Sequence, residues 1–256
     1  MMNTFNLLFN KYELFLLVLV RTSGIFLISP FFSSQNVPNV MKIGFSIILS
    51  ALITLTLDIK VDYTDITFVS IIIKELMVGF VIGFISYAFF STFYVMGQIV
   101  DMKIGFGMIN VMDPQHRVQV PLMGNFYYIL AFLLLLSING HHIIINALID
   151  SYKFIPIGKF VIKEKSTFLL VDVLAKSFAT GFKLSAPVVI IILLTDLFLG
   201  ILSRTIPQMN VFVVGMPLKI LIGLLIISVS MPIFYSMATG VFNQTVETIY
   251  NFLKSF

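Results

Sequence analysis

The stretch LMVGFVIGFISYAFFSTFYVMGQIV, residues 76–100, runs without a single Asp, Glu, Lys or Arg. A second stretch without these residues follows at 118–149 and reads VQVPLMGNFYYILAFLLLLSINGHHIIINALI. The segment between them, DMKIGFGMINVMDPQHR at 101–117, concentrates polar side chains and glycine. Non-helical backbone at membrane depth is tolerated only where protein or a water-filled cavity surrounds it. We therefore interpret residues 101–117 as the functional centre of the chain.

The composition is that of an integral membrane protein built from helices. Hydrophobic residues make up 59% of the chain and charged residues 11%, and the mean hydropathy is +1.04. A soluble domain is roughly 45–50% apolar and about 25% charged. No long polar block interrupts the chain, so we expect an all-α fold and one domain over residues 1–256.

The two termini, the net charge and the absence of cysteine further limit which kinds of protein this chain can be. Residues 1–11 lack the charged region and cleavage site of a signal peptide, so we expect the N-terminus to be retained. The distribution of Lys and Arg favours a cytoplasmic C-terminus. A net charge of +4 is far too small for a nucleic-acid interface. With no cysteine, the chain has no disulfide, thiolate metal site or cysteine nucleophile.

The apolar pattern predicts six or seven helical pieces, several of them poor membrane spans because they are short, charged or broken by proline. We expect these pieces at 12–29, 43–57, 66–100, 121–137, then a shorter one to Asp150, 169–202 with Pro187 inside it, and a last one from Pro217 past Pro232.

Several of these pieces carry charges that lipid does not tolerate. A charge at the centre of a lipid-facing helix costs at least about 2.5–3.5 kcal/mol. In helices this short, the charged side chains cannot all extend to the water at the membrane surface. Two explanations remain open. The charges pair within the chain, for example Arg204 or Lys219 with Asp196, or partner subunits cover them. The set comprises Arg21, Lys74, Glu75, Lys183, Asp196, Arg204 and Lys219.

The residues do not form a recognisable catalytic or metal site. The pair His141-His142 lacks the helical spacing and carboxylate of a zinc protease, which favours a structural or interfacial role. No nucleophile elbow or phosphate-binding loop occurs. Asp101 and Asp113 each have a basic neighbour, Lys103 or Arg117, so ordinary ion pairing is the simpler interpretation. We expect neither enzymatic activity nor a cofactor nor a metal.

The motifs of the chain, taken in order, resemble the FliR family, flagellar biosynthesis proteins of the bacterial type III export gate. The resemblance covers nearly the whole chain and rests on the collinear order of its motifs. They are Val20-Arg21-Thr-Ser-Gly24, Pro30-Phe31-Phe32, Val37-Pro38, Lys42-Ile-Gly44, Met102-Lys-Ile-Gly-Phe106, Asp113-Pro-Gln115, Val120-Pro121, Asn139-Gly140-His141, Pro156-Ile-Gly158, Ala186-Pro187, Asp196-Leu-Phe-Leu-Gly200, Arg204, Pro207-Gln-Met-Asn210, Val211-Phe212, Gly215 and Pro217-Leu-Lys219.

The resemblance implies a subunit of a helical complex with FliP and FliQ, in the bacterial inner membrane at the flagellar basal body. It implies one FliP-like and one FliQ-like helical unit joined in a single chain, a central channel for unfolded export substrates, and FlhB, FlhA and the rod-base protein FliE as further partners. It also implies a luminal plug made by Gly105, Phe106, Gly107, Met108, Ile109, Asn110, Val111, Met112, Asp113 and Pro114. Subunit packing would fall to Arg21, Lys42, Lys74, Glu75, Lys183, Asp196, Arg204 and Lys219.

Three other readings stay open. An injectisome export-gate subunit is the nearest, although Asn139-Gly140-His141 looks more like the flagellar branch. A small secondary transporter would use helices broken near Asn139 and Pro187 and a coupling group at Asp196 or Lys183. A scaffold that only nucleates other subunits would need no pore.

Overall fold

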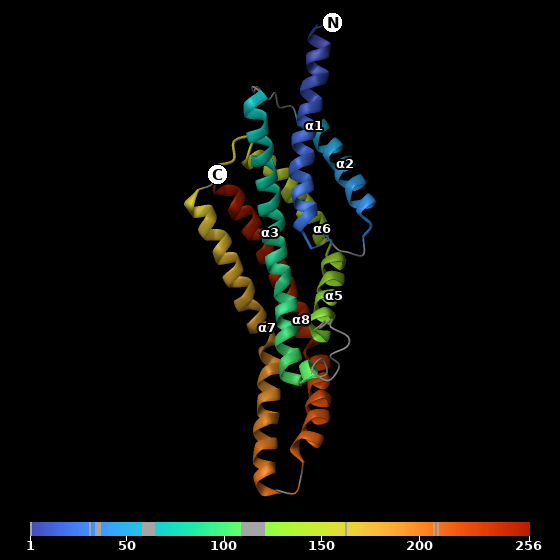
Figure 1. The fold of residues 1–256 in the computed structure, drawn as a ribbon, viewed down its shortest axis with the longest axis vertical. Helices are drawn as coiled ribbons and strands as arrows, with labels where there is room; N and C mark the ends of the chain where they lie inside the picture. The colour runs from blue at the N-terminus through green and yellow to red at the C-terminus, as the bar shows by residue number, and fades with distance from the viewer. Residues whose placement is uncertain are drawn as a thin grey trace. The chain divides into compact units, whose positions relative to one another are not determined.

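The structure is a computed structural model that describes residues 2–30, 32–33, 37–57, 65–108, 121–161, 163–206, 208 and 210–256. These residues form helices and contain no strand, so the predicted all-α class is confirmed (Figure 1). The elements are α1 (Met2–Ile28), α2 (Asn39–Thr56), α3 (Asp65–Ile104), the 3-10 helix η1 (Phe106–Met108), α5 (Leu122–Ser137), α6 (Gly140–Phe154), α7 (Glu164–Thr205) and α8 (Val211–Lys254).

Three helices are longer than the sequence pattern predicts. Helix α3 has 40 residues, α7 has 42 and α8 has 44. The pattern placed Pro217 at the start of the last helix, whereas the structure holds Pro217 inside α8, as it holds Pro187 inside α7. Each proline lacks the N–H group that would donate one hydrogen bond of the helix. A membrane helix tolerates this loss because neighbouring groups satisfy the freed carbonyl.

Four helices of the described chain are long and apolar enough to cross a membrane. They are α2, most of α3, most of α7 and most of α8, and α5 with α6 would add a fifth span if that bent pair crosses as one. Between α5 and α6, Asn139 has a φ of 55°, in the left-handed region that asparagine adopts more readily than most residues. The helix break predicted near Asn139 is therefore present.

Close contacts divide the chain into two compact units made from non-contiguous segments. Unit 1 contains Met1–Phe89, Asn139–Val173 and Asn243–Phe256, and unit 2 contains Phe90–Ile138 and Leu174–Phe242. Helices α3, α7 and α8 each contribute one part to either unit. The single domain expected from composition stays a prediction.

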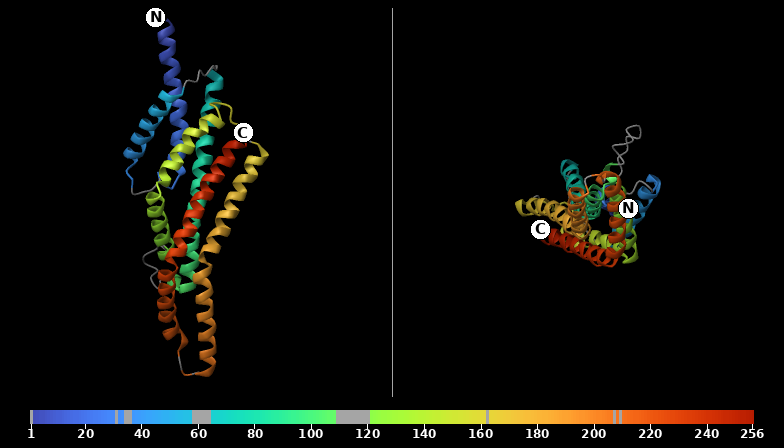
Figure 2. Two further views of the ribbon diagram at one scale, coloured as in Figure 1. Left: turned by 180° about the vertical axis from the view of Figure 1, so that it is seen from behind. Right: turned by 90° about the horizontal axis from the view of Figure 1, so that it is seen from below.

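In unit 1, α1 packs against the first half of α3 at glycine, and α2 lies along α1 (Figures 1 and 2). A Cβ built on Gly79 of α3 would lie 2.2 Å from the backbone oxygen of Arg21 in α1. Small residues allow helix backbones to approach this closely. Stacked rings of Phe26 and Phe32, with Phe45 of α2 beside them, close the space between α1 and α2.

In unit 2, aromatic side chains join the second half of α3 to α5 and α8. The ring of Phe234 in α8 lies 5.8 Å from Phe93 of α3 and 5.2 Å from Tyr127 of α5. Both Phe93 and Tyr127 are fully buried. Helix α7 joins this core where Thr92 Oγ1 donates to the carbonyl of Ser177 at 3.1 Å. Through these contacts the end of α3 and the start of α5 are held against α7 and α8.

Candidate functional site

Asp101 connects the helices on either side of the segment that we interpreted as the functional centre of the chain. Asp101 lies in the last turn of α3 and is buried, and its carboxylate accepts hydrogen bonds from the backbone N–H groups of Met123 and Gly124 at 3.0 and 3.2 Å. The N-cap residue of α5, Pro121, offers no side-chain cap. The carboxylate therefore satisfies donors that open at a helix N-terminus and lies at the positive end of the helix dipole.

This arrangement corrects one sequence-based interpretation. Ion pairing with Lys103 was the simpler expectation for Asp101, but no such ion pair occurs in the described residues, and Lys103 is exposed. On a helix, residues two positions apart point in different directions, so Asp101 and Lys103 face different surroundings. The residues at 101–104 also belong to α3 rather than to the connecting segment.

A glycine pair brings the same two helices together one turn before Asp101. A Cβ added to Gly97 of α3 would lie 2.3 Å from the Cα of Gly124 in α5. No side chain larger than hydrogen fits there without moving a backbone. The contact holds the N-terminus of α5 within reach of Asp101, so the chain enters and leaves the intervening segment at nearly the same place.

Helix α3 ends at a glycine that permits a sharp change of direction. Gly105 has a φ of 101°, which side chains disfavour, and its N–H donates to the carbonyl of Asp101 at 3.1 Å. Residues Phe106–Met108 then form η1. The other predicted plug residues, Ile109, Asn110, Val111, Met112, Asp113 and Pro114, lie outside the described residues.

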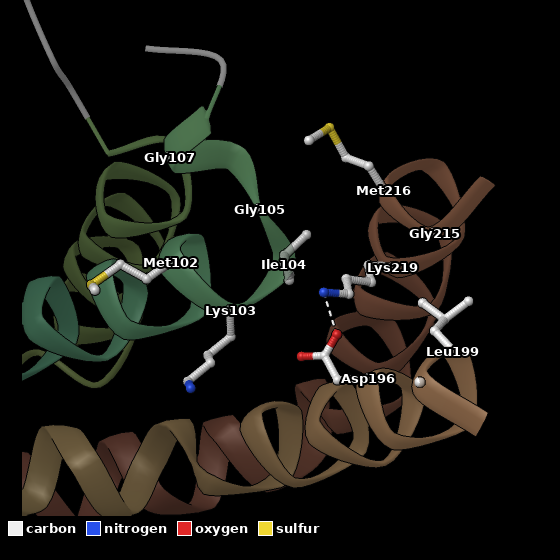
Figure 3. A pocket seen from close by; sticks show the side chains of 11 residues that line it. Met102, Lys103, Ile104, Gly105, Gly107, Asp196, Leu199, Gly215, Met216 and Lys219 are labelled. Atoms are coloured by element: carbon white, nitrogen blue, oxygen red, sulfur yellow. Dashed lines mark ion pairs between the residues drawn. The ribbon is translucent and has the colours of Figure 1, made fainter. Parts of the chain in front are cut away.

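Beside Gly105 lies a hollow of about 490 Å³ within unit 2 (Figure 3). Its walls come from the end of α3, from α7 near Leu199 and from α8 near Met216. Lys219 and Asp196 form an ion pair on one side of it (Figure 3). The sequence left two explanations open for these charges, pairing within the chain or cover by a partner subunit. For Lys219 and Asp196 the structure shows pairing within the chain.

Arg21 forms a second polar centre, at the middle of unit 1. The side chain is fully buried, and its Nε donates to Glu75 Oε2 at 2.7 Å. Its other nitrogens donate to Ser151 Oγ at 2.9 Å and to the backbone oxygen of Ile155 at 3.0 Å. The guanidinium carbon lies 4.1 Å from the centre of the Tyr152 ring, a distance suited to a cation–π contact. Arg21 thus joins α1 to α3 and to α6.

Glu75 and its neighbour Lys74 extend this centre to the turn after α6. The second carboxylate oxygen of Glu75 accepts the Gly158 N–H at 2.9 Å, and Lys74 Nζ donates to the Gly158 carbonyl at 3.1 Å. Gly158 itself has a φ of 76°. The remaining hydrogen bonds of the ion pair therefore join α1 and α3 to α6 and to the turn after it.

The remaining predicted polar residues lie apart from both centres. Lys42 Nζ donates to the carbonyl of Ser33 at 3.2 Å, near the start of α2. Lys183 and Arg204 are exposed on α7, and neither has an ion-pair partner among the described residues. No group of three His, Cys, Asp or Glu side chains suited to a metal ion occurs in the part of the chain that the structure describes.

Comparison with known proteins gives the family. Residues 12–245 match the family described as bacterial export proteins, family 1. The chain belongs to this family. The flagellar biosynthetic protein FliR of Bacillus subtilis is 36% identical over 252 residues, which cover 97% of each chain. FliR of Aquifex aeolicus is 30% identical over 89% of this chain and 88% of its own, and FliR of Escherichia coli is 26% identical over 88% and 87%.

For this bacterial export protein, sequence reasoning found the right helices but missed two pairings. Arg21 and Glu75 were both singled out, yet not as partners. Opposite charges in apolar helices indicate that each needs a partner, but they do not say which partner it is. Asp101 was weighed as an ion-pair member rather than as a cap, and the uncapped helix start after Pro121 was the feature pointing to the second role.

Proposed function

We propose that this chain is a non-enzymatic subunit of the bacterial flagellar type III protein export gate, located in the inner membrane at the flagellar basal body. The supporting observation is the match of residues 12–245 to the bacterial export family, together with 36% identity to a flagellar biosynthetic protein over 97% of both chains. In this role the chain assembles with FliP-like and FliQ-like subunits into a channel for unfolded flagellar substrates. FlhB, FlhA and FliE are the further partners we propose.

Helix α2 supports a role inside an assembly. Its buried residues include Ser46 and Ser50, whose hydroxyls donate to carbonyls of their own helix, while Val40 and Leu55 are 82% and 75% exposed. A helix that turns its apolar residues outward needs lipid or another protein around it.

The exposed charges on α7 distinguish between lipid and another protein as the surroundings of this chain. A cation in the middle of a lipid-facing helix costs at least about 2.5–3.5 kcal/mol. Lys183 is exposed on the apolar α7 and has no acidic partner among the described residues. A partner subunit that brings a carboxylate or carbonyl groups removes this cost, whereas lipid chains do not.

The segment from Gly105 to Pro114 is the luminal plug in this proposal. Its support is the clamp at its base, where Asp101 holds α3 to the N-terminus of α5. A segment anchored at both ends can be displaced by a passing polypeptide and return to the same place. Glycines supply backbone freedom, and Met108, Ile109 and Met112 supply an apolar surface that repacks readily.

The test of the assembly is coexpression. A tagged chain expressed with FliP-like and FliQ-like subunits should recover both partners in one large complex on a native gel. The same chain alone should give a lower yield and a shorter lifetime, because its apolar faces and exposed charges remain uncovered. A stable single chain with no gain from these partners would contradict the proposal and would favour the small transporter.

The same pull-down separates the flagellar from the injectisome reading. Coexpression with the injectisome counterparts of FliP and FliQ in place of the flagellar subunits should recover much less complex. Preferential recovery of the injectisome subunits would reassign the chain to virulence secretion.

A further inference from the structure

A groove in unit 1 combines an apolar lining with one cation. Its volume is about 380 Å³, which lies within the range of small-ligand sites. One wall comes from α3 and the other from the connection between α6 and α7, and both belong to unit 1. The lining residues are Ile73, Lys74, Met77, Phe160 and Val161. Their side chains contain no hydrogen-bond donor other than the Lys74 ammonium, so the groove offers one positive group in otherwise apolar surroundings.

The Lys74 ammonium has no carboxylate partner in the part of the chain that the structure describes. It donates to the backbone oxygen of Gly158 at 3.1 Å, which leaves two of its three N–H groups for another acceptor. The neighbouring Glu75 carboxylate already accepts from Arg21 and from the Gly158 N–H. Asp65, the first residue of α3, lies nine positions before Lys74, roughly 13 Å along the axis and on the opposite side of the helix. Lys74 therefore needs an anion from outside this part of the chain.

The connection that forms the other wall adds positive charge. Residues 153–165 contain four lysines and a single acidic residue, Glu164. Lys153 is paired with Asp150. Lys159, directly before Phe160, is exposed and has no ion-pair partner among the described residues. A ligand in the groove would thus meet a second ammonium group beside that of Lys74.

The same connection indicates that the groove lies at the membrane surface. Its described residues between α6 and α7 are not helical, and irregular backbone does not face lipid inside the hydrocarbon core. Lys74 lies in the apolar span Phe68–Ile104, but its ammonium reaches this connection at Gly158. Lys163 donates to the backbone oxygen of Ser255, so the connection also lies beside the end of α8, which we expect on the cytoplasmic side. Basic pockets on that side of membrane helices bind anionic headgroups.

We propose that this groove binds an anionic phospholipid of the surrounding membrane, with its headgroup against Lys74 and Lys159 and an acyl chain in the apolar part. A partner subunit with an acidic side chain is the competing occupant. Lipid is favoured because the groove matches an amphiphile, with its donor at one group and no other donor in the lining. The cytoplasmic leaflet also supplies anionic headgroups around the chain before any subunit assembles.

The test uses a property of the sequence, since the chain contains no tryptophan. Val161→Trp introduces a single fluorophore at the groove, where Val161 is 59% exposed. Brominated phospholipids quench tryptophan on contact, so the chain is reconstituted in phosphatidylcholine with increasing amounts of brominated phosphatidylglycerol or brominated phosphatidylcholine. Val213→Trp is the matched control, because Val213 is 68% exposed and lies on α8 in unit 2.

We expect phosphatidylglycerol to bind beside Val161 roughly twentyfold more tightly than phosphatidylcholine, with about fivefold from each lysine. The Val213→Trp chain should show no such preference. Added to Val161→Trp, Lys74→Gln and Lys159→Gln should each lower the preference roughly fivefold. Lys153→Gln should leave it unchanged, since Asp150 already neutralises Lys153. Raised salt should weaken the preference through screening.

Two further controls separate charge from folding. A glutamine amide can still donate to the Gly158 carbonyl, so Lys74→Gln removes the charge and keeps a donor there. Lys74→Arg keeps the charge and should keep the preference for phosphatidylglycerol. Loss of the preference in Lys74→Arg as well as in Lys74→Gln would mean that these changes act through the fold, and it would overturn the role of the Lys74 charge.

Several results would contradict the inference. Equal quenching by the two brominated lipids at Val161 would show that charge does not select the occupant. A preference that survives both Lys74→Gln and Lys159→Gln would place the anionic lipid elsewhere. Relief of quenching by glycerol 3-phosphate, which carries the charge without acyl chains, would assign the cations to a free anion.

The competing occupant is tested in the assembled complex. Quenching by brominated phosphatidylglycerol should persist when the Val161→Trp chain is purified with FliP-like and FliQ-like subunits and reconstituted. Loss of quenching in the complex would assign the groove to a partner subunit and overturn the inference. The lipid preference of the chain alone does not depend on the proposed function, so a failure of assembly and a failure of lipid binding are separate results.

Discussion

At the scale of single residues, the structure depends on charged side chains that are buried together with their partners. Arg21 is fully buried, and all of its nitrogens donate to Glu75, Ser151 or the carbonyl of Ile155. The energy of such a group is asymmetric. The intact pair adds little over an apolar pair of similar volume, but removal of one member leaves an uncompensated charge.

Replacing Arg21 with alanine should therefore destabilise the chain by roughly 3–5 kcal/mol, because Glu75 would remain buried without its partner. Lys163→Ala is the control, since the Lys163 ammonium is exposed, donates to the backbone oxygens of Ser255 and Phe256 and lies 5.2 Å from the centre of the Phe256 ring. Complex yield and thermal unfolding by circular dichroism would measure both variants. Equal losses in the two would show that Arg21 reaches water.

At the scale of the helices, glycines have two different roles that sequence does not distinguish. Gly79 lets α1 and α3 meet backbone to backbone, as Gly97 does for α3 and α5. Gly44 in α2 has open space where a Cβ would be, among the described residues. The same substitution should therefore have opposite effects at the two kinds of position.

We expect Gly79→Ala to destabilise unit 1 by roughly 1–3 kcal/mol, because the new Cβ would lie 2.2 Å from the backbone oxygen of Arg21 and the helices must separate. Gly44→Ala should be neutral or stabilising by about 0.5–1 kcal/mol, since alanine is the better helix former. Thermal unfolding of both variants, read by far-ultraviolet circular dichroism, gives the sign directly. A stabilising Gly79→Ala would mean that α1 and α3 are not in contact.

At the scale of the whole molecule, the proposed function depends on a seal that opens for a passing chain. An apolar segment between flexible glycines can close a pore through non-directional contacts and yield when a polypeptide arrives. The clamp made by Asp101 lies outside the plug residues, so the plug can change without loss of the helices that carry it.

Deletion of Met108 to Met112 should loosen the seal and leave assembly largely intact. Leakage of ions or small molecules across the membrane of cells carrying the assembled deletion complex would measure the effect, and complex yield serves as the control. A complex that forms in normal amounts and keeps the membrane as tight as wild type would remove the plug role from this segment.

The sequence by itself determined the membrane class, the all-α fold and the approximate positions of the described α-helices, because hydropathy and its interruptions are local properties. It missed the start of α1, which begins at Met2 rather than near residue 12, and the short η1. It also carried the resemblance to the export family, which the match over residues 12–245 bears out. The helix ends were less certain. Pro217 was expected at the start of the last helix although it lies inside α8, because a proline in an apolar pattern looks like a helix start when the packing around it is unknown.

Only the tertiary structure decided which polar groups meet. Arg21 pairs with Glu75 across 54 positions, and Asp101 caps α5 across 22. A charge in an apolar helix requires a partner, but the choice among several opposite charges and free backbone donors depends on which faces come together. That choice is made where Gly79 and Gly97 allow helices to touch, and the spacing of residues along the chain does not contain it.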